Sequence, residues 1–144
     1  MTKVLIVYCS RTGNTEEMSK AVEQGIKAVG AEVVRKRTGE VEPADFLDCD
    51  AVAFGSPTNF GYMAGALKEV FDSILLGLQK QIAGLPYAAF GSGRRGTRKV
   101  AEAIEGICDA LQLKKTGEGV VSTGKPTDEV LAQCQELGKK LGSV

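Results

Sequence analysis

The sequence predicts an α/β protein: a three-layer, doubly wound sandwich in which helices cover both faces of a five-stranded parallel sheet. Two observations predict this class. Short apolar runs alternate with amphipathic helical patterns along the 144 residues, and strands joined through helices pair in parallel. The first run, residues 4–8, is apolar throughout, as in a strand buried on both faces. Repeated alternation of this kind favours an open sheet with right-handed crossovers.

Each element is predicted from its own pattern. Apolar and β-branched composition predicts strands over residues 4–8, 32–37, 51–55, 85–90 and 116–122. Apolar residues at three- and four-residue steps predict helices over residues 18–29, 67–78, 100–111 and 130–141, the last capped near Thr127. The strand at 116–122 is less apolar and is expected at an edge. Residues 41–50 are expected to form a polar connection with Phe46 and Leu47 packed beneath it.

The composition predicts one domain, residues 1–144, in a reducing cytoplasm. Eighteen basic and eighteen acidic residues balance, so the charge points to neither nucleic acid nor a membrane. The sequence shows no secretory signal and no run long enough to span a bilayer. Without histidine or a close pair of cysteines, zinc sites, redox dithiols and Ser-His or Cys-His mechanisms are excluded, and we expect no metal. The dispersed cysteines are expected to be buried thiols: Cys9, Cys49, Cys108 and Cys134.

A hydroxyl-rich loop connects the first strand to the first helix. It consists of Ser10, Arg11, Thr12, Gly13, Asn14 and Thr15. The N–H groups that open a helix have no partner within it, and the helix dipole adds positive charge there, so an anion is the expected occupant. A nucleotide triphosphatase would need a Gly-Lys-Ser/Thr triplet, which is absent. The loop therefore suits a single phosphate monoester, with an ordinary helix-capping turn as the alternative.

The loop after the third strand combines polar groups with aromatic rings. It consists of Ser56, Pro57, Thr58, Asn59, Phe60, Gly61, Tyr62 and Met63. Hydroxyl, amide and aromatic groups together suit a flat heteroaromatic ring with polar edges, which could stack on Phe60 or Tyr62. The alternative is a hydrophobic staple that starts the next helix.

The loop after the fourth strand is rich in glycine and arginine. Gly91, Gly93 and Gly96 satisfy a G-x-G-x-x-G pattern, but a dinucleotide fingerprint belongs to the first strand–helix turn, so we discount it. Arg94 and Arg95 have three alternative roles: they could point into solvent, bind a phosphate of a nicotinamide donor, or meet an acidic patch on a partner protein.

These loops resemble those of the flavodoxin family. Residues 10–15 are similar to its Ser/Thr-x-Thr-Gly-Asn-Thr signature, and residues 90–97 align with Phe-Gly-Cys-Gly-Asp-x-x-Tyr, from which Arg94 and Thr97 depart. Residues 55–63 are similar to Gly-x-Pro-Thr-x-Phe-Gly-x-Met of the quinone-reducing, tryptophan-repressor-binding-like branch. The resemblance covers essentially the whole chain. It implies strand order 2-1-3-4-5 and a flavin mononucleotide (FMN) cofactor at the carboxyl ends of the strands.

The resemblance also implies roles for the loop residues. The phosphate would lie on the loop from Ser10 to Thr15, with contacts from Ser10, Thr12, Asn14, Thr15 and the backbone amides between them. Ser56 and Pro57 would belong to the cofactor site, and Thr58 to Gly61 would contact the isoalloxazine ring, with the Phe60-Gly61 peptide facing flavin N5. Ser92, Gly93, Arg94 and Arg95 would line the pyrimidine edge, and Tyr62 or Phe60 would stack. No side chain is assigned as a catalytic acid or base.

Three functions are compatible with this interpretation. The first is an electron shuttle, expected as a monomer, between a reductase and an acceptor protein. Balanced charge weakens it, because such carriers usually steer to basic partners with an acidic face. The second is an NAD(P)H-dependent FMN quinone oxidoreductase, for which this chain is short of the extra segments of that branch. The third is a flavin-free interaction domain on the same fold.

Overall fold

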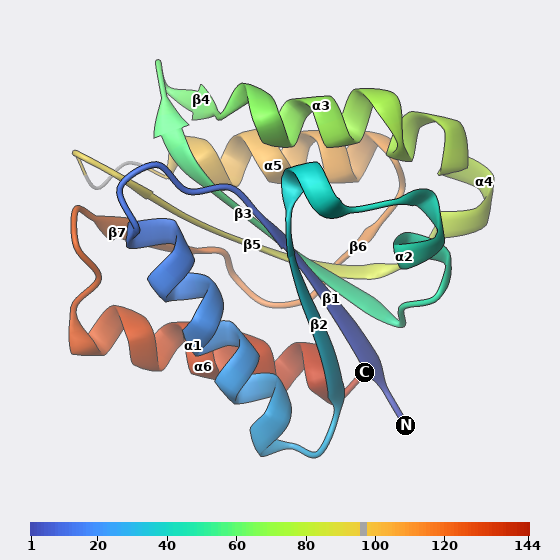
Figure 1. The fold of residues 1–144 in the computed structure, drawn as a ribbon, viewed down its shortest axis with the longest axis horizontal. Coiled ribbons are helices and arrows are strands. Elements are labelled where there is room, and N and C mark those ends of the chain that lie inside the picture. Colours follow the sequence, from blue (N-terminus) through green and yellow to red (C-terminus); the bar gives the residue numbers. More distant parts are fainter. Residues whose placement is uncertain (96–97) are drawn as a thin grey trace.

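A parallel sheet lies between two layers of helices in the computed structural model, which describes residues 1–95 and 98–144 (Figure 1). The strands are β1 (Lys3–Tyr8), β2 (Glu32–Arg37), β3 (Ala51–Asn59), β4 (Tyr62–Met63), β5 (Pro86–Gly93), β6 (Lys114–Lys115) and β7 (Val120–Thr123). The main path is β2-β1-β3-β5-β6, and all of its pairings are parallel. β6 pairs with the start of β5 and β7 with its end, so together they fill one edge position. The predicted order 2-1-3-4-5 is therefore confirmed, with the fifth strand interrupted between β6 and β7.

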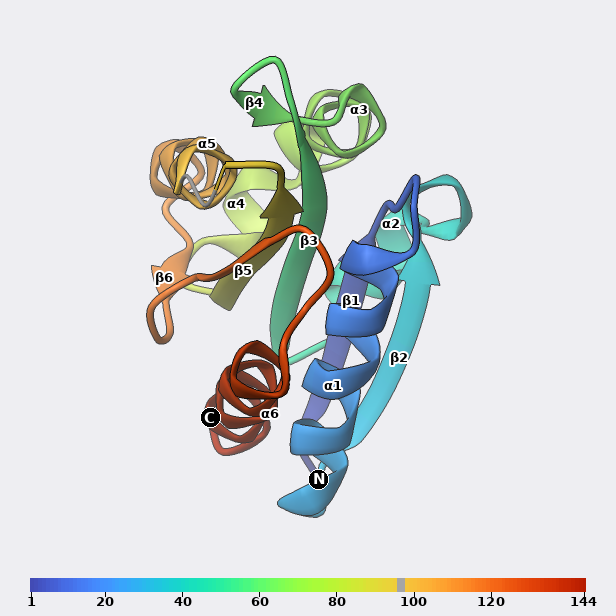
Figure 2. The ribbon, with the colours of Figure 1, turned by 90° about the vertical axis from the view of Figure 1, so that its left-hand side faces the viewer.

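Helices cover both faces of the sheet, and Figure 2 shows the same arrangement after a quarter turn. They are α1 (Asn14–Ala28), α2 (Pro43–Leu47), α3 (Gly65–Ser73), α4 (Gln79–Ile82), α5 (Lys99–Ala110) and α6 (Asp128–Gly142), with 3-10 turns η1 (Thr38–Glu40) and η2 (Leu75–Leu78). α1 and α6 lie on one face, and α3 and α5 on the other. Alternate residues of a strand point to opposite faces, so β1 supplies Val4 and Ile6 to one core and Leu5 and Val7 to the other. Within residues 1–95 and 98–144, none of the helices combines the length and apolar character that a bilayer crossing requires.

Helices α1 and α6 approach each other through glycines. A β-carbon at Gly25 would overlap the carbonyl oxygen of Gln135, and one at Gly138 would overlap the carbonyl oxygen of Val22. The two helices therefore meet backbone to backbone. This close packing fixes the second half of α1 against α6 on one face of the sheet.

Some boundaries differ from the sequence prediction. The connection at 41–50 contains α2, which buries Phe46 as predicted but leaves Leu47 54% exposed. A single helical turn points neighbouring residues about 100° apart, so only one of the two can face the core. The predicted helix 67–78 ends as an α-helix at Ser73 and continues as the 3-10 turn η2.

The third strand continues past its predicted end at Gly55 and forms a hairpin. β3 extends to Asn59 and pairs antiparallel with β4 in the register Thr58↔Met63 and Asn59↔Tyr62. Phe60 and Gly61 form the two-residue turn, with φ of 52° and 73°. Positive φ at both central residues gives the twist that joins two antiparallel strands tightly. The hairpin carries these two residues out over the carboxyl edge of the sheet.

Candidate functional site

The loops after β1, β3 and β5 meet at the carboxyl edge of the sheet and enclose a cleft of about 770 Å³. Most of the predicted site residues line it: Arg11, Thr12, Asn14, Pro57, Thr58, Asn59, Phe60, Gly61, Ser92, Gly93, Arg94 and Arg95. Lys99, at the start of α5, and Gly124, after β7, line it as well and were not predicted. The topology held a signal for Gly124, because the fifth strand also ends at this edge.

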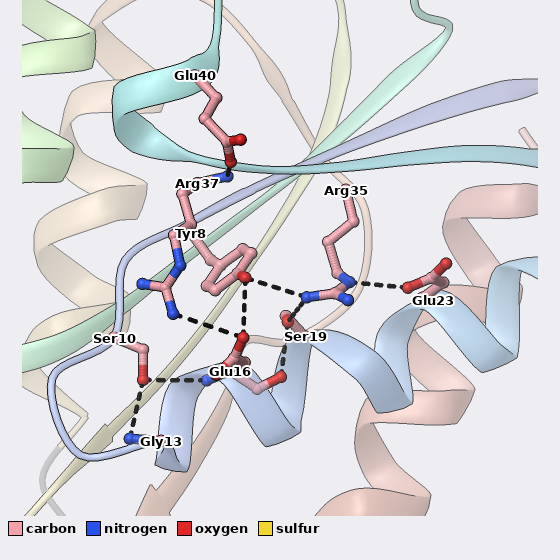
Figure 3. Close-up of polar contacts among 9 residues, drawn as sticks. All are labelled: Tyr8, Ser10, Gly13, Glu16, Ser19, Glu23, Arg35, Arg37 and Glu40. Atoms are coloured by element: carbon pink, nitrogen blue, oxygen red, sulfur yellow. Dashed lines mark hydrogen bonds and ion pairs between the residues drawn. The ribbon is translucent and has the colours of Figure 1, made fainter.

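Ser10 organises the loop after β1 from within. Its Oγ accepts hydrogen bonds from the backbone N–H groups of Gly13 (3.2 Å) and Glu16 (3.3 Å), as Figure 3 shows. Gly13 has φ of 98° and turns the chain into α1. Neither Ser10 nor Gly13 lines the cleft. Ser10 therefore caps the helix, as in the capping turn that the sequence offered as one alternative.

Two backbone amides remain for a ligand at the helix start. The first-turn N–H groups of a helix have no acceptor within it, and Ser10 takes those of Gly13 and Glu16. The amides of Asn14 and Thr15 are left at the positive end of the helix dipole. The side chains of Thr12 and Asn14 line the same part of the cleft. This donor set is neutral and suits a phosphate monoester.

A buried hydrogen bond joins the first loop to the third. Thr15 Oγ1 lies 2.9 Å from Ser92 Oγ, and the two residues are 1% and 6% exposed. The Thr15 side chain is thus directed into the fold, and Thr15 does not line the cleft. Thr58 Oγ1 donates to the carbonyl oxygen of Ser92 at 3.0 Å, so the second loop is tied to the third as well.

Ser56 fixes the base of the hairpin. It is fully buried, accepts a hydrogen bond from the Ala64 backbone N–H (2.8 Å) and donates one to the Pro57 carbonyl oxygen (2.7 Å). The tip carries Phe60, whose side chain is fully exposed, and the Lys99 side chain passes over Gly61. Tyr62 is 40% exposed and lies outside the cleft lining.

The glycines at the end of β5 allow the strand to lie close to β3. A β-carbon at Gly91 would crowd the Ser56 carbonyl oxygen at 2.5 Å, and one at Gly93 would crowd Thr58 Oγ1 at 2.9 Å. Close strand packing therefore explains two glycines of the G-x-G-x-x-G pattern. The third, Gly96, and the predicted departure at Thr97 lie outside the described residues.

A network of polar groups anchors the first turn of α1 to β1 and β2 (Figure 3). The Tyr8 hydroxyl donates to Glu16 Oε2 (3.2 Å) and accepts from an Arg35 N–H (3.1 Å). Arg37 pairs with Glu16 at 3.4 Å, Arg35 pairs with Glu23 at 2.8 Å, and both guanidinium groups stack on the Tyr8 ring. Burial raises the pKa of Glu23, but hydrogen bonds from Arg35 and Lys27 outweigh it and lower the pKa overall. Glu16, in the first turn of α1, and Glu23, farther along the helix, are thus each paired with a cation.

Comparison with known proteins points to one family. A family model described as Flavodoxin matches residues 6–138. This chain is similar to a flavodoxin of Aquifex aeolicus (35% identity over 158 aligned residues; 98% of this chain, 85% of the relative). It is also similar to an NAD(P)H dehydrogenase (quinone) of Archaeoglobus fulgidus (30% over 186 aligned residues; 100% and 97%). The solved structure of a flavodoxin from the domain Archaea has a TM-score of 0.88 at 26% identity, covering 99% of this chain and 97% of that chain.

Proposed function

This chain belongs to the flavodoxin family, and on that premise we propose that it binds FMN in the cleft and passes electrons between redox partner proteins. One observation carries the proposal. The amides of Asn14 and Thr15 stand without helical acceptors at the start of α1, where Asn14 lines the cleft. The rest of the lining combines hydroxyl, amide and glycine groups with the cations Arg11, Arg94, Arg95 and Lys99. FMN joins a phosphate and a ring with polar edges in one molecule, and these two groups match the two parts of the cleft.

The fit to FMN follows from the chemistry of the donors. The amides of Asn14 and Thr15, with the Thr12 hydroxyl, would bind the phosphate. Residues 57–61 and 92–95 would line the ring from two sides. When bound, the flavin supplies the redox chemistry, and the protein supplies orientation and electrostatics.

The hairpin turn is the chain's own adjustable element at the ring. The peptide between Phe60 and Gly61 presents either its carbonyl oxygen or its N–H, depending on which way it faces. Glycine at the second position permits both orientations, because it has no β-carbon to clash in either. The turn would accordingly accept or donate a hydrogen bond as the ring's protonation changes.

Titration of the apoprotein with FMN and with riboflavin tests the proposal. Hydrogen bonds to a charged phosphate contribute about 1.5–3 kcal/mol each, so FMN should bind at least about 100-fold more tightly than riboflavin. Equal affinities would contradict the phosphate site. Anaerobic reduction of the loaded protein then tests the transfer mode: two separate one-electron stages support a shuttle.

A second candidate is NAD(P)H-dependent quinone reduction, favoured by the Archaeoglobus relative and by Arg94 and Arg95 at the cleft. Against it, that alignment runs over 186 positions although this chain has 144 residues, so the relative carries segments without a counterpart here. Saturable quinone turnover with NADPH, together with a single two-electron stage on reduction, would replace the shuttle with this activity. We further propose that residues 1–144 act as one domain and as a monomer.

A further inference from the structure

The arginines of the chain fall into two groups. One group is bonded within the fold: Arg35, Arg37 and Arg98. The other consists of Arg11, Arg94 and Arg95, which are exposed and make no ion pair or hydrogen bond with another described residue. All three of these line the cleft. We name them the arginine rim.

The residues of the arginine rim lie on two sides of the cleft and are not gathered at one point. Arg11 lies on the loop after β1, whereas Arg94 and Arg95 lie after β5, with β3 and its hairpin between them. Lys99 adds a further cation to the lining, and no carboxylate belongs to it within the described part of the chain. A single bound phosphate could use one side of this arrangement, but an extended acidic face could use both.

An exposed aromatic ring stands among these cations. Phe60 is fully exposed at the tip of the β3–β4 hairpin, and its φ of 52° is unusual for a bulky residue. A fully exposed phenylalanine in an unfavourable backbone conformation does not stabilise the fold, which indicates a role in contacts with another molecule. Arginine and aromatic residues are the types most enriched at the centres of protein interfaces.

We propose that the arginine rim and Phe60 form the docking surface for a redox protein whose contact face is acidic. The proposal rests on the proposed function, because docking here brings a partner to the cleft. The net charge of the chain is zero, so any preference must come from the local arrangement of charge. Charges placed around a docking site act mainly on the association rate and on the choice of partner.

Stopped-flow mixing of the reduced, FMN-loaded protein with two electron acceptors tests the charge preference. The probes are an acidic cytochrome b5 and a basic cytochrome c. The rate with cytochrome b5 should fall at least about 10-fold as NaCl rises from about 10 to 500 mM, because salt screens attraction. The rate with cytochrome c should rise or stay constant. The opposite pair of salt dependences would overturn the proposal.

Charge reversal locates the effect. The rim variant Arg11→Glu/Arg94→Glu/Arg95→Glu is compared with Lys20→Glu/Lys80→Glu/Lys114→Glu, which changes the net charge equally at exposed lysines outside the cleft lining. The ratio of the two cytochrome rates cancels a change in the reducing power of the flavin, because both receive electrons from it. The rim variant should lower the b5-to-c ratio by about 100-fold and the control by only a few-fold. Equal changes would assign the effect to net charge and overturn the proposal.

Single substitutions keep the test decisive if the triple variant loses FMN. Arg11→Gln and Arg94→Gln should each lower the same ratio by about 3- to 10-fold. Failure of the proposed function would appear separately, as no FMN binding or no transfer to either cytochrome. Saturable reduction of the wild type by NADPH that the rim variants lose would assign the arginines to nucleotide phosphates and overturn the docking surface.

Discussion

The same substitution, threonine to valine, should affect FMN binding at Thr12 and stability at Thr15, although both residues belong to one loop. Thr12 is exposed and lines the cleft. Thr15 is 1% exposed, and its hydroxyl lies 2.9 Å from that of Ser92. Valine has nearly the shape of threonine, so each Thr→Val substitution removes a hydroxyl and leaves the volume almost unchanged. The two variants therefore separate ligand binding from loop stability.

The magnitudes follow from what each hydroxyl contacts. Thr15→Val leaves the buried Ser92 Oγ without its partner, so the free energy of unfolding should fall by about 1–3 kcal/mol. Thr12→Val removes a hydroxyl that faces water in the apoprotein, so stability should change by less than about 0.5 kcal/mol. A lost hydrogen bond to a charged phosphate should weaken FMN by about 10- to 100-fold and leave riboflavin unchanged.

Urea unfolding of the apoproteins and fluorescence titration with both flavins measure these effects. A double-mutant cycle with Ser92→Ala isolates the buried bond, because the double variant leaves no orphaned hydroxyl. It should be less destabilised than the sum of the single variants by about 1 kcal/mol. The reasoning fails if Thr12→Val destabilises more than Thr15→Val, or if Thr12→Val weakens both flavins equally.

Three further predictions concern the scaffold. Gly138→Ala should destabilise the protein by about 1–3 kcal/mol in urea, because its β-carbon meets the Val22 backbone. Gly106→Ala, in the interior of α5 with nothing within 4 Å, is the matched control and should stabilise by about 0.5–1 kcal/mol. Phe60→Asn should raise the urea midpoint, since asparagine tolerates positive φ, while slowing transfer to cytochrome b5. Burial raises the pKa of Cys134 from 9.0 to about 12. The folded state therefore holds this proton more tightly than the unfolded chain, so the contribution of this thiol to stability is fully present below pH about 9 and is lost at about 1.4 kcal/mol per pH unit above it. Burial also raises the pKa of Cys49 and of Cys108, which add to the same loss. Cys134→Ala should reduce the total slope by about 1.4 kcal/mol per pH unit, and an unchanged slope would contradict this origin.

The centre of the sheet was predictable because β1 and the start of β3 are buried on both faces. Such strands appear in the sequence as continuous apolar runs, so both could be located directly. The continuation of β3 to Asn59 could not, since residues 56–59 are polar and their extended conformation depends on partners elsewhere. Pro57 pairs with Ser92, and Ser56 is bonded to Ala64. Pairing of this kind is set by tertiary structure rather than by local composition.

The position of the cleft was predictable from topology, but the direction of its side chains was not. The parallel strands β1, β3 and β5 end at one edge, which brings the loops that follow them together whatever those loops contain. Whether a hydroxyl faces the ligand or the fold depends on distant groups. Thr15 faces Ser92, seventy-seven residues away, and that partner could not be read from the loop. Lys99 was missed because it begins a helix, outside any loop motif.

If FMN binds as proposed, the inward-facing hydroxyls imply that the loop after β1 would bind the phosphate mainly through its backbone. Ser10 accepts hydrogen bonds from two amides of the loop, and the amides of Asn14 and Thr15 remain as the donors for that phosphate, beside the exposed cation Arg11. Glu16 is paired with Arg37, which keeps its negative charge from opposing that anion. The proposed phosphate site thus depends on backbone geometry and on polar contacts within the fold, so few residues there can be substituted without a loss of structure. The exposed rim arginines make no ion pair or hydrogen bond with another described residue, so substitutions there should affect ligands and partners rather than the stability of the fold.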